Sequence, residues 1–299
     1  MTVTLVLTLL LSVLIGVSLG LLGGGGSILT VPILTYVAGM DAKEAIAASL
    51  FVVGVTSAFS AISHARNNRV RWRTGLIFGV ASMAGAFLGG ILGGFIPGTL
   101  LMIAFALMML ATSIAMIRGR KSTGDPDKAG ERKLPLVKVL AEGLVVGLVT
   151  GLVGAGGGFL VVPALALLGG LPMPVAIGTS LVVIAMKSFA GLAGYLTTVS
   201  LDWVLVGSVT LAAIVGSVIG AKLAGRIPET ALRKGFGVFV LVMGVFVLVQ
   251  ELPGPFGLIV AGAAAVAAVA AAICWFAVPS CPLRPRTPAR ASTDAAGAP

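Results

Sequence analysis

The chain has 299 residues, of which 58% are hydrophobic and only 10% are charged. A soluble domain could not cover so much apolar surface with so few polar side chains, so the composition predicts an integral membrane protein whose main partner is the lipid bilayer. The formal charge of +10 comes from lysines and arginines gathered in short loops. No basic face with interleaved aromatic side chains accompanies it, and we therefore expect no nucleic-acid partner.

Apolar stretches follow one another along the chain. They lie at residues 4–22, 75–95, 100–117, 204–221, 235–249 and 256–278. A helix of about 20 residues crosses the ~30 Å hydrocarbon core of a bilayer. The short alternating segments of a membrane β-barrel do not occur in the sequence. The predicted fold class is therefore an all-α polytopic membrane protein.

A glycine-rich motif occurs twice. Residues 20–32 read GLLGGGGSILTVP, and residues 151–163, which follow 131 positions later, read GLVGAGGGFLVVP. The same offset matches Trp72 with Trp203 without a gap, so the chain contains two homologous halves. The offset also matches the pair Gly85 and Gly89 with the pair Gly216 and Gly220. Small residues four positions apart let membrane helices pack closely.

The duplication predicts the organisation of the chain. We expect a membrane transporter domain over residues 1–250, with repeat 1 at about 4–117, a cytoplasmic linker at 118–138 and repeat 2 at about 139–250. One extra transmembrane helix at 256–278 and a disordered, basic cytoplasmic tail at 279–299 follow the repeats.

Loop charges predict opposite orientations for the two repeats. Loops rich in lysine and arginine prefer the cytoplasm. The loop at 64–73 contains four arginines, whereas its match at 197–203 contains no base and carries Asp202. The turn at 95–99 is neutral, whereas its match at 226–230 begins with Arg226. Matched loops should therefore lie on opposite faces, as in an inverted repeat.

Each glycine cluster should turn a helical hairpin. The linker and the loop at 226–234 are both basic, so an even number of crossings separates them, and residues 173–197 and 203–224 supply two. Residues 139–170, and by repetition 4–39, must then enter and leave on one face. The second arm, 27–39 or 158–170, extends about 20 Å as helix, which is less than the core thickness. A broken or re-entrant hairpin is predicted, and the choice between full crossing and re-entry stays open.

The glycine clusters are candidates for an anion site. Non-helical backbone at membrane depth is tolerated only inside protein or beside a water-filled cavity, and glycine leaves its N–H groups accessible. The alternative is that these glycines only permit a tight turn or close packing. Two clusters in register favour a transport pathway. The predicted binding residues are Gly23, Gly24, Gly25, Gly26, Ser27, Gly154, Gly156, Gly157 and Gly158, with Pro32 and Pro163 in a structural role.

Lys187 lies near the middle of an apolar segment, where inserting a lysine costs roughly 2.5–3.5 kcal/mol. We predict that it forms an electropositive wall of the anion path, although it could instead snorkel or pair with a backbone carbonyl. Thr179 and Ser180 precede it by about two turns, and Ser49 is the match of Ser180 in the first repeat. These hydroxyls are predicted to bind substrate, the alternative being ordinary hydrogen bonds between helices.

The sequence lacks the common motifs of enzymes and of metal and nucleotide sites. The sequence contains no paired acids, no HExxH and no P-loop, so we predict no cofactor, no metal site and no enzymatic activity. A serine hydrolase would have to use His64, the only histidine, which lies next to the arginine-rich loop.

The paired motifs resemble those of the TauE/SafE family of sulfite exporters. The resemblance covers about residues 5–250 and depends on the two glycine motifs, each ending in proline, and on AIGTSL at 176–181. It implies a secondary carrier that moves sulfite, a sulfonate or a related small organic anion across the bacterial inner membrane. An anion channel, an intramembrane enzyme and an accessory membrane scaffold are the alternatives. The anion, the direction of transport, coupling to a proton or another ion, and assembly into a homo-oligomer stay open.

Overall fold

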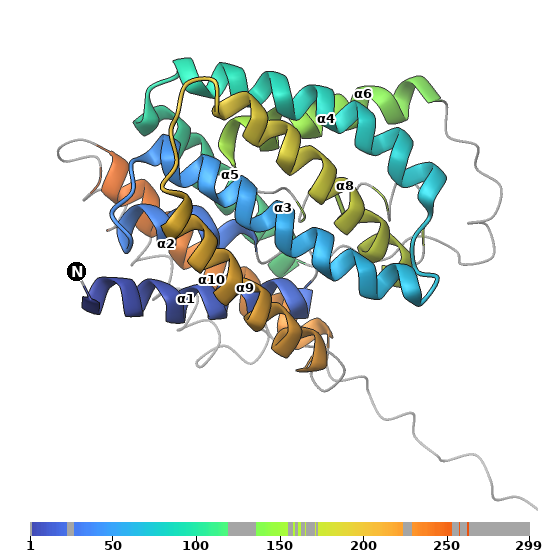
Figure 1. Cartoon of the computed structure of the whole chain (residues 1–299), viewed down its shortest axis with the longest axis horizontal. Helices are drawn as coiled ribbons and strands as arrows, with labels where there is room; N and C mark the ends of the chain where they lie inside the picture. The colour runs from blue at the N-terminus through green and yellow to red at the C-terminus, as the bar shows by residue number, and fades with distance from the viewer. Residues whose placement is uncertain are drawn as a thin grey trace, which may run out of the picture.

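The computed structural model describes residues 2–22, 27–118, 136–154, 158, 161–162, 165, 171, 173–223, 229–252, 257 and 262. Within these ranges the secondary structure is helical throughout, with no strand (Figure 1). The predicted all-α fold class is therefore confirmed. The tail at 279–299 and all but residues 257 and 262 of the predicted helix at 256–278 lie outside the described residues.

The described helices are distributed over both halves of the chain. The first half contains α1 (Thr2–Leu22), α2 (Thr30–Tyr36), α3 (Ala42–Arg66), α4 (Trp72–Phe95) and α5 (Gly98–Arg118). The second half contains α6 (Leu136–Val153), α8 (Met173–Tyr195), α9 (Trp203–Leu223) and α10 (Glu229–Glu251). Five of the described helices, α1, α4, α5, α9 and α10, overlap the predicted apolar stretches, whereas α3 lies outside every predicted stretch. By length and composition, α1, α3, α4, α8 and α9 are long and apolar enough to cross a membrane. Helix α5 includes Arg118 and α6 begins at Leu136, so helix occupies both ends of the predicted linker, whose residues 119–135 are not described.

The start of α9 has a clear local cause. The Asp202 carboxylate accepts hydrogen bonds from the backbone N–H groups of Val204 at 3.0 Å and Leu205 at 3.2 Å. Such a cap satisfies N–H groups that have no partner within the first helical turn. The acidic residue that marked this loop in the sequence therefore also fixes where the helix begins.

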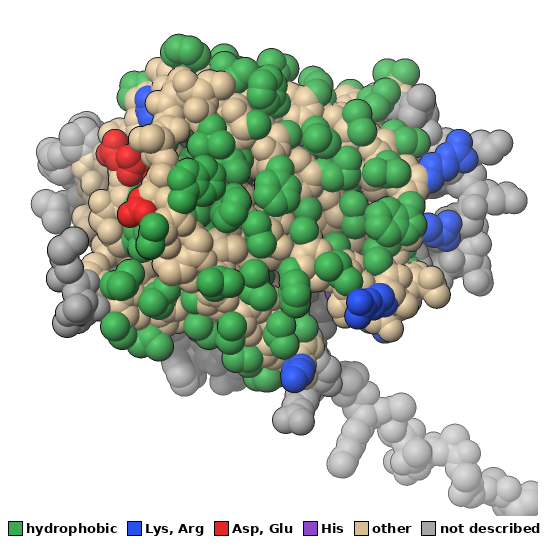
Figure 2. Space-filling model, viewed as in Figure 1, with side chains coloured by type: hydrophobic (Ala, Val, Ile, Leu, Met, Phe, Trp, Pro, Cys, Tyr) green, Lys and Arg blue, Asp and Glu red, His purple; other side chains and the backbone are tan. Residues whose placement is uncertain are grey.

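The surface has the distribution of polarity that a bilayer requires. Large apolar side chains are widely exposed on the long helices, including Leu10 at 64%, Leu211 at 67% and Val204 at 84%. On the face in Figure 2, most lysine and arginine side chains lie at the right-hand end, the acidic side chains lie at the left-hand end, and apolar side chains occupy the middle. An apolar band between two charged ends fits a protein that spans the hydrocarbon core.

The two halves pack against each other through glycines. Helix α1 packs on α9, and α6 packs on α4. A Cβ atom placed on Gly16 would overlap the carbonyl group of Ala213, and one placed on Gly147 would overlap that of Ser82. These two contacts are related by the 131-residue offset, because Gly16 matches Gly147 and Ser82 matches Ala213. The packing of α1 on α9 is therefore repeated by the packing of α6 on α4.

The glycines predicted to allow close packing lie in these same contacts. A Cβ atom on Gly85 would overlap the backbone of Leu144, and one on Gly216 would overlap the backbone of Val13. Leu144 and Val13 are again matched by the offset. The prediction of close helix packing at these positions is confirmed, and it holds because the carbonyl group of one helix occupies the space that a side chain on the other would need.

The loops that join matched helices lie at different ends of the molecule. The connection from α3 to α4 is at the right-hand end of Figure 1, and the connection from α8 to α9 is at the left-hand end. The first of these loops is the arginine-rich one and the second carries Asp202. The charge difference seen in the sequence is thus a difference between the two ends of the helical body.

Replacing Gly216 by alanine should destabilise the protein by about 1–3 kcal/mol, the usual cost of forcing an extra carbon into packed structure. The reason is that the new Cβ would meet the backbone of Val13 and Val17. The measurement is the thermal unfolding midpoint of purified protein in detergent. Gly207→Ala is the control on the same helix, since a Cβ there meets nothing within 4 Å. Equal midpoints for the two variants would contradict the proposed packing.

Candidate functional site

The second glycine motif begins where α6 ends. Gly154 follows the helix with a φ of +73°, a conformation that L side chains rarely adopt. Its N–H donates to the carbonyl oxygen of Thr150 at 3.0 Å, and its own carbonyl oxygen accepts a hydrogen bond from the Ser49 hydroxyl of α3 at 3.0 Å. Two residues predicted from separate halves, Ser49 and Gly154, are therefore in direct contact.

The structure describes only some of the other residues of the two glycine motifs. Gly23, Gly24, Gly25, Gly26, Gly156, Gly157 and Pro163 lie outside the described residues. Ser27 and Gly158 are both buried. Pro32 is buried in the first turn of α2, where a proline is tolerated because its missing N–H would have no partner within the helix.

Lys187 is fully buried on α8. Its side chain is 1% exposed, and its Nζ donates to the Thr150 hydroxyl of α6 at 2.8 Å. Thr150 in turn donates its proton to the carbonyl oxygen of Val146 at 2.7 Å, so it is free to act as an acceptor for the lysine. Among the buried side chains of the described residues Lys187 carries the only charge, and no aspartate or glutamate accompanies it. Two of its three N–H donors have no described acceptor.

The geometry joins Lys187 to the glycine motif. Thr150 lies one helical turn before Gly154, and the two are linked by a backbone hydrogen bond. Lys187, Thr150, Gly154 and Ser49 thus form a continuous series of polar contacts across α8, α6 and α3. Sequence analysis did not select Thr150, and its match in the first repeat, Leu19, gives no polar signal that could have revealed it.

The remaining predicted hydroxyls have other partners. Thr179 accepts a hydrogen bond from the backbone N–H of Arg71 at 3.0 Å, in the loop before α4. Ser180 donates to the carbonyl oxygen of Ile177 within its own helix at 2.7 Å. Both residues are fully buried, but neither has a described contact with Lys187. They lie about two turns away along α8, toward the end that holds the arginine-rich loop.

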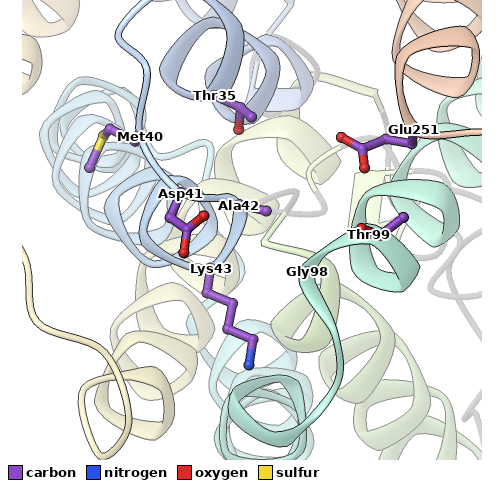
Figure 3. A pocket seen from close by; sticks show the side chains of 8 residues that line it. All are labelled: Thr35, Met40, Asp41, Ala42, Lys43, Gly98, Thr99 and Glu251. Carbon is purple, nitrogen blue, oxygen red and sulfur yellow. The ribbon is translucent and has the colours of Figure 1, made fainter.

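A separate cavity of about 330 Å³ lies among α2, α3, α5 and α10 (Figure 3). Its lining includes the carboxylates of Asp41 and Glu251. The Tyr36 hydroxyl donates to Glu251 at 2.8 Å, and Lys43 donates its Nζ to the carbonyl oxygen of Gly94 at 2.7 Å. None of the predicted binding residues that the structure describes lines this cavity. The lining carries two carboxylates and one lysine, Lys43, so its net negative charge would repel an anion and the buried Lys187 is the better candidate for an anion site.

The helices and the buried lysine define a class of protein. Five apolar helices long enough to span a bilayer, with an ionisable side chain in the interior of the bundle, are typical of multi-pass membrane proteins that conduct or carry a polar solute.

Residues 8–247 match the model of the sulfite exporter TauE/SafE family, and the chain belongs to that family. It is therefore a membrane transporter protein, and its place is the inner membrane of the cell, which it crosses several times. The resemblance noted in the sequence is confirmed over most of the chain.

Relatives are found in bacteria and archaea. A probable membrane transporter protein of Xylella fastidiosa is 33% identical over 82% of this chain and 95% of its own length. A second, from Methanocaldococcus jannaschii, is 30% identical over 78% of this chain and 91% of its own length. The protein YdhB of Bacillus subtilis, with the same description, is 26% identical over 81% of this chain and 99% of its own length. No solved structure matches the chain.

Replacing Ser49 by alanine should lower the unfolding free energy by about 1–3 kcal/mol, because the buried carbonyl group of Gly154 loses the donor that satisfies it. Thermal unfolding in detergent measures the effect. Ser208→Ala is the control, since that hydroxyl only bonds carbonyl groups of its own helix. If both variants unfold like the wild type, the contact between Ser49 and Gly154 does not contribute to stability.

Proposed function

We propose that the chain is a secondary transporter of a small sulfur-containing anion, such as sulfite, a sulfonate or a related organic anion, which binds beside Lys187. The observation that carries the proposal is the burial of this amine, at 1% exposure, with no acidic side chain among the buried described residues. An isolated charge inside a membrane bundle is costly and is usually retained for function. A bound anion would supply the missing counter-charge.

The substrate contacts of this proposal combine the lysine with backbone groups. Lys187 would contribute two N–H donors, because its third is used by Thr150. The glycines Gly23 to Gly26 and Gly156 to Gly158, with Ser27, would contribute backbone N–H groups, which bind small anions where no Cβ intervenes. Gly154 would form the turn that presents the second cluster, because its own N–H is bonded to Thr150. Ser49 would position the second cluster through its hydrogen bond to Gly154. Thr179 and Ser180 would line the path between the basic end of the molecule and the lysine.

An inverted repeat with two broken or re-entrant hairpins would allow alternating access. This proposal is supported by the packing of α1 on α9 and of α6 on α4, and by the position of matched loops at opposite ends of Figure 1. It is also supported by the seven-residue length of α2, which is too short to cross the hydrocarbon core. In such carriers, one unit rocks against the other around a central site.

Lys187→Met should reduce anion flux by roughly 100-fold, because the anion loses a charged contact worth about 3 kcal/mol. The assay is uptake of sulfite into liposomes that contain the purified protein. Lys222→Met is the matched control, since Lys222 is exposed in the last turn of α9. Full flux in Lys187→Met would remove the lysine from the site. Flux that neither saturates nor shows counterflow would identify a channel, and no flux of any anion would favour a scaffold or an enzyme.

Cysteine labelling tests the topology. In a variant whose two native cysteines are serines, Asp202→Cys should react with an impermeant maleimide added outside intact cells. Glu229→Cys should react only after the cells are opened. These positions follow from placing the basic ends of both repeats in the cytoplasm. The reverse pattern, or labelling of both positions from the same side, would contradict the inverted repeat.

A further inference from the structure

Two buried hydroxyls on the described helices have no hydrogen-bond partner and occupy matching positions in the two halves. They belong to Ser57 on α3 and Ser188 on α8, which are 1% and 0% exposed. The positions differ by 131, the offset of the repeat. Ser188 directly follows Lys187, and Ser57 directly follows Thr56, the residue that matches Lys187 in the first repeat.

Most buried hydroxyls of this protein are satisfied within their own helix. Ser12, Thr56 and Ser217 each donate to a carbonyl oxygen three or four residues earlier, at 2.7–2.8 Å. A serine in a helix can make this bond by rotating one side-chain torsion. An unpaired buried hydroxyl costs about 1–3 kcal/mol. The absence of the bond at both Ser57 and Ser188 therefore calls for a partner from outside the described residues.

Repeat symmetry separates these two serines from the other unpaired hydroxyls. Ser82 and Thr30 are also buried, and their oxygens also have no described partner. However, Ser82 matches Ala213 and Thr30 matches Val161, so neither hydroxyl is repeated in the other half. Only the pair on α3 and α8 recurs among these fully buried positions.

Both serines lie on helices that pack against each other, and Ser188 lies at the contact of α8 with α3. A Cβ atom placed on Gly54 of α3 would lie 3.4 Å from the Cβ of Ser188. Ser57 is three residues after Gly54, on approximately the same face of α3. Gly54 and Ser188 therefore meet at the contact between α3 and α8, and Ser57 lies about one helical turn from Gly54 along α3. Thr56 does not compete for a ligand, since its proton is bonded to Val52.

We propose that Ser57 and Ser188 are two further binding residues for the transported anion, and that with Lys187 they select an anion that presents three oxygen atoms. This inference rests on the transport function proposed above. Each serine can donate one hydrogen bond, and Lys187 has donors in reserve. A sulfite or sulfonate group offers one oxygen acceptor to each of the three side chains. A carboxylate has lone pairs for three hydrogen bonds, but its two oxygens lie in one plane with the carbon, so it would meet the three donors less well than the pyramidal SO₃ group.

The test compares methanesulfonate with acetate as ligands of the purified protein in detergent, with binding measured by calorimetry and flux measured in liposomes. The wild type should prefer methanesulfonate. Ser57→Ala and Ser188→Ala should each weaken methanesulfonate binding by roughly 10-fold, because a hydrogen bond to a charged group is lost. Acetate binding should change less, so the ratio of the methanesulfonate affinity to the acetate affinity should fall in both variants. Ser217→Ala, at a buried serine already bonded to Ile214, is the control and should bind like the wild type.

Stability provides a second readout that a purely structural role would not produce. Without ligand, the two alanine variants should unfold at the same temperature as the wild type or at a higher one, because alanine removes an unpaired buried hydroxyl. Lower stability with unchanged binding would show that the hydroxyls bond within the protein and would overturn the inference, as would an unchanged preference between the ligands. If a variant does not fold, the near-isosteric Ser57→Cys and Ser188→Cys replace it. Absence of binding and flux for methanesulfonate and sulfite in the wild type would overturn the proposed function itself.

Discussion

The structure depends on the close approach of helix backbones at glycine positions. Inside a bilayer the lipid chains are as apolar as leucine, so helices gain little from burying apolar side chains and associate through tight packing and polar contacts instead. At Gly16 and Gly147 the carbonyl group of the partner helix occupies the space where a side chain would otherwise be. These contacts join α1 of the first half to α9 of the second, and α6 of the second half to α4 of the first. The two halves are therefore interlocked and do not lie side by side as separate units.

This interlocking leaves α3 and α8 to meet each other at the middle of the molecule. Several buried polar groups lie on these two helices. Lys187 is bonded to Thr150, Ser49 is bonded to Gly154, and the hydroxyls of Ser57 and Ser188 are unpaired. Glycines allow close packing at the contacts of α1 with α9 and of α6 with α4, and the proposed function assigns anion binding to the polar side chains of α3 and α8. A lysine in one half and a threonine at the matching place in the other make this centre asymmetric in charge despite the repeat.

The sequence predicted the general architecture well. Hydrophobic stretches located α1, α4, α5 and α9 to within a few residues but missed α3, and the glycine pairs on α4 and α9 correctly predicted where helices pack closely. Helix in a membrane follows from local composition, because every backbone group must be satisfied within its own segment. The family was also recognisable from two short motifs. The orientation of the repeats and the form of the hairpins remain predictions based on loop charge and length.

The sequence by itself determined that this protein is a duplicated helical membrane protein of the TauE/SafE family with one lysine deep in an apolar helix. Only the tertiary structure decided what surrounds that lysine. Thr150 is the partner of Lys187, although the residue that matches Thr150 in the first repeat is a leucine. Thr179 bonds the backbone of Arg71, and the two unpaired serines lie on α3 and α8, which pack together. The physical reason is that burial and hydrogen bonding of a side chain depend on which helices meet, and helix pairing is set by contacts between residues far apart in the chain.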